Sequence, residues 1–571
     1  MQWPRSILDD IRRADGTYLT EGSFDRFVQH IRGGIDLTTA FSGAGGDAIG
    51  VLLLATATAL NDDDALAAGE RHSQVTFLTA TDKRKVCRRI LTGYRDGMRP
   101  HHVFGDYCDR IPQGVRRALA LVQPEVGGEC ENYSNQFEVM AEILNHCSPH
   151  LFCDGAQGKC DVHNGNCPLY PPQHGKLSIH WAGTICIDLS VMGSQSGPCG
   201  PYSKLFLLWV HERRKRQETL LIHECTPAFP ESLLLRFLGD IYAARSIIFG
   251  PEDLGWWVQR PRKFTFLLHK ERTTFANDIS SFGPTFFRHK NRDCERGDMF
   301  FCTDDTWVTE AFKKMRAEAM RYEERRQQNP SSKFCHAVQD AAKRRVRRMS
   351  KEDATWIDLL GNGNMNRLRN YRQAEKQIES DLVVGVLSSM ETVSVEIASE
   401  LDHYAKAGIV PQVVNLVQNF GSKGGSSLTS GVPTLLTRSK LWSMRKHRLM
   451  MGCEAMLCQG IPIVQVPSAF PAPFDSSKFT HSQLISVAGN AIHSACAAAL
   501  TGWALASLVP ITGCITIESD SDVDAMVDPE AQPRLSRQLA EDCMCDHSAS
   551  QSSEASSSSL APAPGGSDVI E

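Results

Sequence analysis

The stretch "IRGGIDLTTAFSGAGGDAIGVLLLATATAL", residues 31–60, decides the fold. An apolar run typical of a strand is followed by a glycine-rich turn and then by an apolar helical pattern. Residues 74–90, "QVTFLTATDKRKVCRRI", repeat this order, and shorter apolar runs follow at 101–112, 217–230 and 263–270. Strands that alternate with helices predict a doubly wound, mostly parallel α/β sheet with helices on both faces. Ligands bind beyond the carboxyl ends of the strands in such sheets.

The composition is that of a soluble globular protein. Of 571 residues, 42% are hydrophobic and 22% charged, which is enough for two or more domains with full-sized cores. The first residues, "MQWPRSILDDIRRADG", lack the apolar centre of a secretory signal, so we expect an intracellular, reducing location and free thiols for the 19 cysteines. The apolar segment 494–517 predicts a buried helix and a strand-like piece; membrane contact is the alternative.

Charge is unevenly distributed along the chain. Residues 516–571 hold 12 acidic and 2 basic residues, a net of −10, which leaves +5 for the rest because the whole chain is at −5. The segment 313–348 carries 12 Lys/Arg against 4 Asp/Glu. We therefore expect a disordered acidic tail and a mildly basic body that binds a polyanion, with simple solubility as the alternative.

One cysteine- and histidine-rich stretch lies between residues 146 and 167. Its candidate metal ligands are Cys147, Cys153, Cys160, His163 and Cys167. Their spacing does not match the standard structural zinc patterns. We expect a loop of reduced cysteines and assign no metal; a small zinc site is the alternative.

Eight short motifs occur in an order that resembles the cytosine-C5 methyltransferase family, whose members use S-adenosylmethionine. The motifs are "DLTTAFSGAGG" (36–46), "TDK" (81–83), "GDY" (105–107), "GTICIDLSVMGSQSG" (183–197), "LFLLWVHERRKRQETLLIHECT" (205–226), "VQRPRKF" (258–264), "EAMLCQGIP" (454–462) and "VAGNAIHSACAAAL" (487–500). No single motif is decisive, but the ordered set is specific. The resemblance covers about 31–270 and 440–505.

The resemblance implies a Rossmann-like methyltransferase domain with an inserted recognition region. The chain then divides into four parts, which are 1–270 (the first part of the catalytic domain, with the cysteine-rich insertion at about 146–170), 271–440 (the basic insertion), 441–515 (the second part of the catalytic domain) and 516–571 (the acidic tail).

The resemblance also implies the catalytic residues. Cys186 is the expected nucleophile, which adds to C6 of cytosine and so activates C5. Glu224, on the neighbouring strand end, protonates or hydrogen-bonds N3 of the base. Arg260 or Arg262 holds the base oxygen or a phosphate near the thiolate. A target base in duplex DNA must be flipped out to reach such a site.

The cofactor site is implied in the same way. S-adenosylmethionine is expected to lie with its methionine end against the glycine loop, which contains Phe41, Ser42, Gly43, Gly45 and Gly46. Asp82 would meet the ribose and Asp106 the adenine amine, while Asn490 and Ala491 would close the pocket.

The sequence departs from the family pattern at two positions beside the catalytic residues. Ile185 stands where the family has proline, and Cys225 where it has asparagine. The expected function is methylation of cytosine C5 in DNA. RNA cytosine methylation and a catalytically silent nucleic-acid-binding relative are the alternatives. Nuclear location is expected from the substrate and from "KRRVRR" (343–348), and no membrane partner is expected.

Overall fold

The structure is a computed structural model. It describes residues 2–60, 74–122, 133–171, 176–184, 188, 197, 200, 202–287, 297–304, 306–308, 310, 321, 413–415, 431–443, 448–464, 468 and 470–511.

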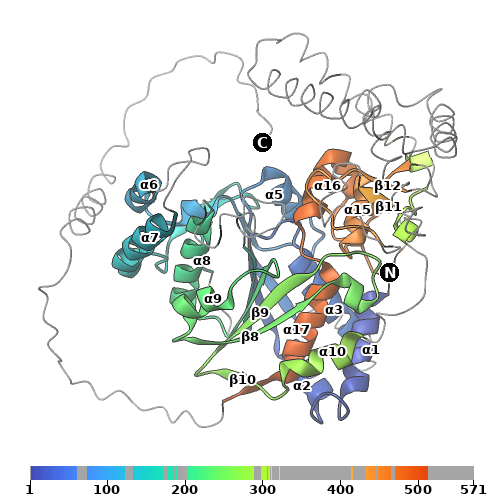
Figure 1. Ribbon diagram of the computed structural model, residues 1–571, viewed down its shortest axis with the longest axis horizontal. Coiled ribbons are helices and arrows are strands. Elements are labelled where there is room, and N and C mark those ends of the chain that lie inside the picture. The colour runs from blue at the N-terminus through green and yellow to red at the C-terminus, as the bar shows by residue number, and fades with distance from the viewer. Residues whose placement is uncertain are drawn as a thin grey trace, which may run out of the picture.

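A nine-stranded sheet forms the centre of the molecule (Figure 1). Its strands are β1 (Ile35–Ala40), β2 (Val75–Thr81), β3 (His102–Phe104), β4 (Gln157–Cys160), β5 (Gly165–Pro168), β6 (Leu177–Gly183), β7 (Leu220–Cys225), β8 (Tyr242–Phe249) and β9 (Arg262–His269). Their spatial order is β5-β4-β3-β2-β1-β6-β7-β9-β8. The expected mixed α/β fold with a mostly parallel sheet is confirmed.

The direction of the strands changes only toward the two edges of the sheet. The five central strands β3, β2, β1, β6 and β7 are parallel to one another. At one edge, strand β9 lies between β7 and β8 and is antiparallel to both. At the other edge, β4 is antiparallel to β3, and β5 is antiparallel to β4. Without that hairpin, the order has the Rossmann arrangement, in which the chain reverses direction across the sheet between β1 and β6.

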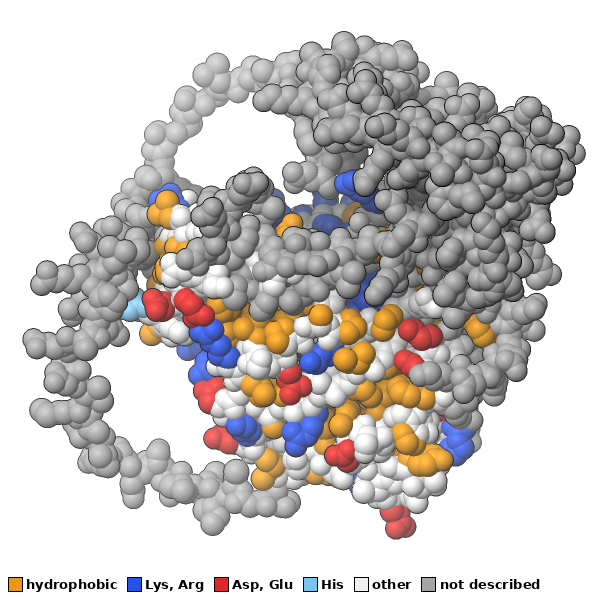
Figure 2. Space-filling view, in the orientation of Figure 1, with side chains coloured by type: hydrophobic (Ala, Val, Ile, Leu, Met, Phe, Trp, Pro, Cys, Tyr) orange, Lys and Arg blue, Asp and Glu red, His pale blue; other side chains and the backbone are white. Residues whose placement is uncertain are grey.

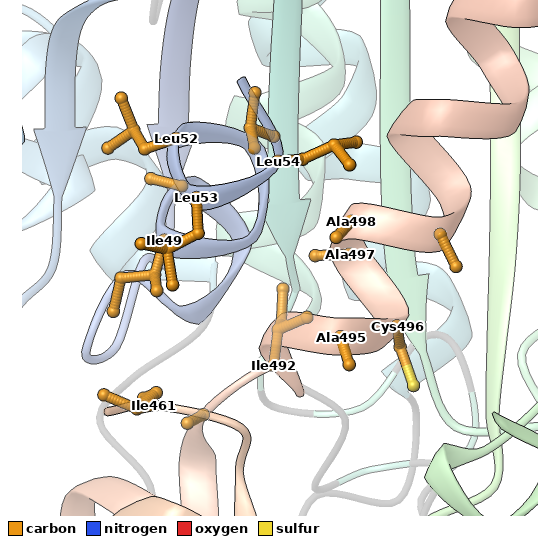
Figure 3. Close-up of a cluster of buried hydrophobic side chains, with 14 of the residues drawn as sticks. Ile49, Leu52, Leu53, Leu54, Ile461, Ile492, Ala495, Cys496, Ala497 and Ala498 are labelled. Carbon is orange, nitrogen blue, oxygen red and sulfur yellow. The ribbon is translucent and has the colours of Figure 1, made fainter. Parts of the chain in front are cut away.

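One face of the sheet is covered by an apolar helical layer. Its main helices are α1 (Trp3–Ala14), α2 (Ser23–Gly33), α3 (Gly46–Leu60), α5 (Lys85–Thr92) and α17 (Ser494–Ser507). Figure 3 shows Leu54 of α3 on the side that faces Ala497 and Ala498 at the start of α17. The two helices cross closely because Gly50 has no side chain: a Cβ there would lie 2.5 Å from the carbonyl oxygen of Ser494. Both α3 and α17 are apolar on all sides, which is typical of helices buried in a core.

The opposite face is covered by helices that come from the middle of the chain. They are α6 (Gln113–Val122), α7 (Tyr133–Cys147), α8 (Ser203–Arg216) and α9 (Glu231–Leu238). They form a second core cluster with the alternate side chains of the same strands, such as Leu221 of β7 and Leu267 of β9. The sheet therefore has helices on both faces, as the sequence predicts.

Three smaller parts complete the described chain. The short strands β11 (Val413–Asn415), β12 (Leu441–Ser443) and β13 (Arg448–Leu449) form a small antiparallel sheet near α15 (Gly452–Cys458) and α16 (His481–Asn490) (Figure 1). Strand β10 (Thr273–Phe275) pairs with β14 (Leu508–Pro510), and α10 (Phe282–Phe286) packs on α1. The segment 273–286, assigned above to the insertion, thus lies on the main body. The acidic tail and nearly all of the basic segment 313–348 lie outside the described residues.

One helical stretch, 481–507, is long and apolar enough to cross a membrane by length and composition. Within the described residues, 89% of its apolar 18-residue window is buried, and the stretch is split into α16 and α17, as in core helices, so it is weak evidence for a span. On the face seen in Figure 2, basic and acidic side chains of the described residues are interspersed.

Candidate active site

The residues expected to form the site follow the carboxyl ends of the parallel strands. Because β1, β2, β3, β6 and β7 run in the same direction, these ends share one edge of the sheet. The glycine loop follows β1, Asp82 follows β2, and Asp106 follows β3. Glu224 lies near the end of β7. The fold therefore gathers motifs that are far apart in the sequence.

The glycine loop between β1 and α3 needs an unusual backbone. Phe41, Gly43 and Gly45 have φ values of 56°, 55° and 70°, in the left-handed region that favours glycine. The loop is also tightly packed: a Cβ on Gly45 would lie 2.6 Å from the hydroxyl of Tyr94. The glycines of this motif are thus required by conformation and by close approach.

Asp82 braces that loop. Its Oδ2 accepts a hydrogen bond from the Gly43 amide at 2.9 Å, and its Oδ1 accepts one from the Arg84 amide at 2.8 Å. Burial raises the pKa of Asp82, while Arg84 and these two amides oppose that rise. The contacts give Asp82 a role in shaping the turn; its contact with a ribose stays a prediction.

Asp106 and Tyr107 lie beside the glycine loop. The rings of Tyr107 and Phe41 stack with centroids 5.1 Å apart. Asp106 Oδ1 accepts from the Cys108 amide at 3.0 Å, and its Oδ2 lies 3.4 Å from Lys83 Nζ. The Asp106 side chain keeps 28% of its surface exposed, so it can still accept a hydrogen bond from a ligand.

A buried polar network supports the short 3-10 helix η1 (Tyr107–Arg110) that follows Asp106. Glu212 of α8 accepts hydrogen bonds from Tyr107, from Arg213, from Tyr170 at 2.7 Å and from Arg110 at 2.5 Å. Burial raises the pKa of Glu212 to about 7, although Arg213 lowers it. The network holds η1 and Tyr107 in place.

The connection between α16 and α17 closes over the glycine loop. A Cβ on Gly43 would lie 3.5 Å from the carbonyl oxygen of Asn490, and one on Gly46 would lie 2.0 Å from that of Ile492. Asn490 is exposed, whereas Ala491 is buried. The structure therefore brings Asn490 and Ala491 to the loop, although 440 residues separate the two segments in the chain.

Glu224 lies next to the strand end that leads to Cys186. In the parallel register of β6 and β7, Gly183 is the partner of Glu224. A Cβ on Gly183 would lie 3.2 Å from Glu224 Oε2, so a larger residue would crowd the carboxylate. Glu224 Oε1 also forms an ion pair with Arg262 Nε at 2.9 Å, in which both side chains are mostly buried.

The two arginines of the sequence motif have different neighbours. Arg262 pairs with Glu224, as described. Arg260 donates to the carbonyl oxygens of Leu435 and Gly489 at 3.3 Å, and so ties β9 to the segment that precedes Asn490. Of the two candidates for a role next to the expected nucleophile, Arg262 is the one placed in an ion pair with Glu224.

Cys186 lies outside the described residues, but both flanks of its segment are placed. Thr184 Oγ1 is hydrogen-bonded to His223 Nε2 at 2.7 Å. Asp188 Oδ2 accepts from the Tyr202 amide, at the start of α8, at 2.8 Å. The chain on either side of residues 185–187 is thus attached to β7 and α8.

Of the two departures from the family pattern, the structure describes one. Ile185 lies outside the described residues. Cys225 is 1% exposed and belongs to the core cluster under α8 and α9, on the face of β7 opposite to Glu224. Although Cys225 is next to Glu224 in the sequence, it therefore belongs to the packing beneath the site.

Sequence reasoning missed one acidic residue. Asp47, in the first turn of α3, is fully buried, and its Oδ2 has no hydrogen-bond partner among the described residues. Its pKa is raised to about 7, mainly by burial and also by the negative charges of Glu224 and Asp82, while the amides of Ala48 and Asp47 oppose the rise. A buried carboxylate beside the glycine loop, with one oxygen bound to the Ala48 amide and the other without a partner, is a candidate partner for a cationic ligand. The sequence did not indicate a functional role for Asp47, because acidic residues are common in the first turn of a helix.

Comparison with known proteins gives little further information. No family model and no curated protein matches the sequence. Among solved structures, a protein described as a DNA modification methyltransferase encoded within an E. coli prophage matches at 12% identity and a TM-score of 0.22, over 41% of this chain and 47% of its own. The chain thus spans about half the length of that protein.

Two further matches cover more of the chain. The Entamoeba histolytica methyltransferase EhMeth matches at 12% identity, over 82% of this chain and 97% of its own, and the S. pombe Dnmt2 methyltransferase at 11%, over 82% and 96%. Both TM-scores are 0.33. Similarity at this level carries no argument about activity, which must be argued from the chain's own residues.

Proposed function

We propose that the protein is an S-adenosylmethionine-dependent methyltransferase that acts on C5 of cytosine in DNA. The observation that carries the proposal is the position of the Glu224–Arg262 pair. The sheet register places it beside Gly183, three residues before Cys186, at the edge of the sheet that also carries the glycine loop. A nucleophile, an acid and a cation at one end of a nucleotide-binding sheet suit base methylation.

The residues present fit the proposed cofactor. When bound, S-adenosylmethionine supplies a methyl group on a positively charged sulfur. Phe41, the glycine loop and Asp106 would hold it, with Asn490 and Ala491 closing over it. The fit is supported by the unpartnered carboxylate oxygen of Asp47, which is suited to a positive charge, and by the partly exposed carboxylate of Asp106.

The chemistry proposed for the protein's residues is nucleophilic. The Cys186 thiolate adds to C6 of the cytosine, and a proton held by Glu224 at N3 neutralises the charge that develops in the ring. C5 then has the electron density to accept the methyl group. Loss of the C5 proton restores the double bond and expels the thiolate, so the enzyme returns to its starting state.

The remaining assignments concern the partner. The basic segment 313–348 would contact phosphates in a salt-dependent manner, and the part of 271–440 that follows the segment 273–286 would recognise the target. DNA is preferred over RNA because of this large insertion, and a nuclear location follows from that substrate. The acidic tail, 516–571, would compete for the basic surface at low salt.

A methyl-transfer assay tests the proposal directly. Purified protein with tritiated S-adenosylmethionine should label duplex DNA more than single-stranded DNA or tRNA. Cys186→Ala should abolish labelling, and Cys199→Ser, in the same loop, should leave it intact. Labelling of tRNA alone would favour the RNA alternative. Absence of labelling in a protein that binds the cofactor would favour the silent relative.

A trapping experiment tests the covalent step. DNA that contains 5-fluorocytosine has no proton to lose at C5, so the methylated adduct with Cys186 should survive denaturing gels. Glu224→Gln should slow trapping strongly, because an amide cannot supply the N3 proton. Trapping that persists in Cys186→Ala would contradict the assigned nucleophile.

A further inference from the structure

Four potential metal ligands converge at one edge of the central sheet, away from the catalytic residues. They are His102, Cys160, His163 and Cys167, and their ligand atoms all lie within 4.8 Å of one another. Two imidazoles and two thiols are a donor set that zinc prefers. None of the four has a role in the proposed methyl transfer.

The fold brings these residues together through three strands. His102 begins β3, and Cys160 ends β4, which pairs with β3 at Phe104. A tight turn, with Asn164 at φ 55°, leads into β5 and carries His163. The register of the hairpin then places Cys167 opposite Gly158, close to the turn. Backbone pairing therefore positions all four side chains.

Three of the ligand–ligand distances are close to those of a tetrahedral site. Cys160 Sγ lies 3.9 Å from His102 Nδ1 and 3.5 Å from His163 Nδ1, and Cys167 Sγ lies 3.2 Å from His163 Nδ1. Zinc bound to sulfur at about 2.3 Å and to nitrogen at about 2.0–2.1 Å requires ligand–ligand separations of roughly 3.3–3.8 Å. Small side-chain rotations would bring all four atoms to one ion.

We propose that His102, Cys160, His163 and Cys167 form a structural zinc site. Four protein ligands fill a tetrahedral shell and leave no open position, which is typical of structural rather than catalytic zinc. The two thiolates would balance the charge of the ion. Cys147 and Cys153 belong to the same cysteine-rich stretch but not to the cluster; Cys153 Sγ instead lies near the carbonyl oxygens of Pro149 and Leu151.

Among the described residues, the hairpin is attached by the ion pair of Asp161 with Arg88 at 2.6 Å, by the hydrogen bond from the Asp161 amide to the Val103 carbonyl at 2.8 Å, and by a small core. Its local core cluster contains only four buried residues, Phe104, Cys160, Cys167 and Leu169. Small structural units of this kind commonly rely on a metal or on disulfides. Zinc would fasten the hairpin to β3 and so cover an otherwise open strand edge. Because β3 leads to Asp106, the clip would also support the proposed cofactor pocket, although the zinc assignment does not depend on the proposed function.

Metal analysis of the full-length protein, purified without chelators or metal-affinity resin, tests the site. We expect one zinc per chain. Zinc should be lost in Cys160→Ser/Cys167→Ser and in His102→Ala. The matched controls are Cys153→Ser and the exposed neighbour His101→Ala, which should both retain it. Zinc-free wild-type protein that also fails to take up added zinc, or full zinc in the double variant, would overturn the proposal.

X-ray absorption on the wild-type protein removes the risk that a variant fails to fold. The expected zinc environment has two sulfur atoms at about 2.3 Å and two nitrogen atoms at about 2.0–2.1 Å. Coordination by four sulfur atoms, or by oxygen and nitrogen alone, would show that other residues bind the metal and would refute the assignment.

Discussion

The two faces of the central sheet are covered in different ways. The layer of α3 and α17 buries almost only hydrocarbon, with Asp47 as the one charged residue in these two helices. The layer of α8 instead buries Glu212 and Arg213, which are 0% and 3% exposed, together with Arg110 from η1. The sheet is thus held on one face by close packing and on the other partly by a charged network.

The difference follows what each layer supports. The apolar layer stabilises the sheet through burial alone, which is non-directional. The network connects α8 to η1, directly behind Asp106 and Tyr107, and hydrogen bonds fix direction as well as distance. Buried ion pairs often add little net stability, so their benefit here is best sought in the placement of η1.

The largest effect is expected from breaking the network. Glu212→Ala leaves Arg110 and Arg213 buried without this carboxylate, which should lower the free energy of unfolding by about 3–5 kcal/mol. Urea denaturation measures it. The control is Glu138→Ala, whose pair with Arg236 is about half exposed and should change stability by about 0–1 kcal/mol. Equal losses in the two variants would show that burial of the network has no energetic consequence.

The apolar layer should respond less and without electrostatic character. Leu54→Ala, in α3 against Gly502 of α17, creates a cavity and should cost about 3 kcal/mol. Leu60→Ala, at the 42% exposed end of the same helix, is the control. Salt and pH should hardly alter the difference between these two variants. A strong salt dependence would mean that the two layers are not distinct in the way described.

The same comparison explains what could be predicted from the sequence. Strand, glycine loop and helix over 31–60 were predictable because hydrophobic periodicity and glycine reflect local structure. The place of Glu224 at a strand end followed from motif order. The buried network around Glu212 could not be predicted from the sequence, because "HERRKR" (211–216) is typical of an exposed basic helix end. The fold shows that Glu212 and Arg213 are buried.

The sequence indicated only part of the proposed zinc site, for a related reason: it offered Cys160, His163 and Cys167 as candidate ligands, with a zinc site as the alternative, but not His102. His102 lies 58 residues before Cys160, so spacing within 146–167 showed only part of the ligand set. Strand pairing between β3 and β4 supplies the missing ligand. Asp47 was missed because burial decides its role, and one acid in a first helical turn carries no sign of it.

Asp47 makes the apolar layer sensitive to pH. Its pKa is raised from 3.8 to about 7, so the folded state holds a proton that the unfolded state releases. The Asp47 carboxyl group therefore makes its full contribution to the free energy of unfolding below pH 3.8, and this contribution is lost as the pH rises through about 7. Asn at this position cannot ionise, so the stability of Asp47→Asn relative to wild type should increase by roughly 2.6 kcal/mol from pH 5 to pH 8.

Denaturation of the ligand-free protein at both pH values measures this change, with the exposed Asp96→Asn as the control. Ligand binding then tests the proposed cofactor contact. Asp47→Asn should weaken the binding of S-adenosylmethionine, whose sulfur is charged, about tenfold more than the binding of S-adenosylhomocysteine, whose sulfur is neutral, a difference of about 1.4 kcal/mol. Equal weakening of the two ligands would place Asp47 away from the sulfur.

The smallest effect is expected from Cys225→Asn, which tests whether the core under α8 tolerates an unpaired polar group. Cys225 is fully buried there, next to Glu224 but on the opposite face of β7. Cys225→Asn restores the family residue but places an amide in this core, and should cost about 1–2 kcal/mol of unfolding free energy. Cys225→Ala separates the loss of packing from the burial of a polar group. If the Cys225→Asn variant is less stable than Cys225→Ala while trapping by 5-fluorocytosine DNA is unchanged, then Cys225 serves the packing of this core and not the reaction. If asparagine instead raises the trapping rate, then residue 225 acts on the pocket, and the separation between the core under α8 and the site above β7 is less complete than the structure indicates.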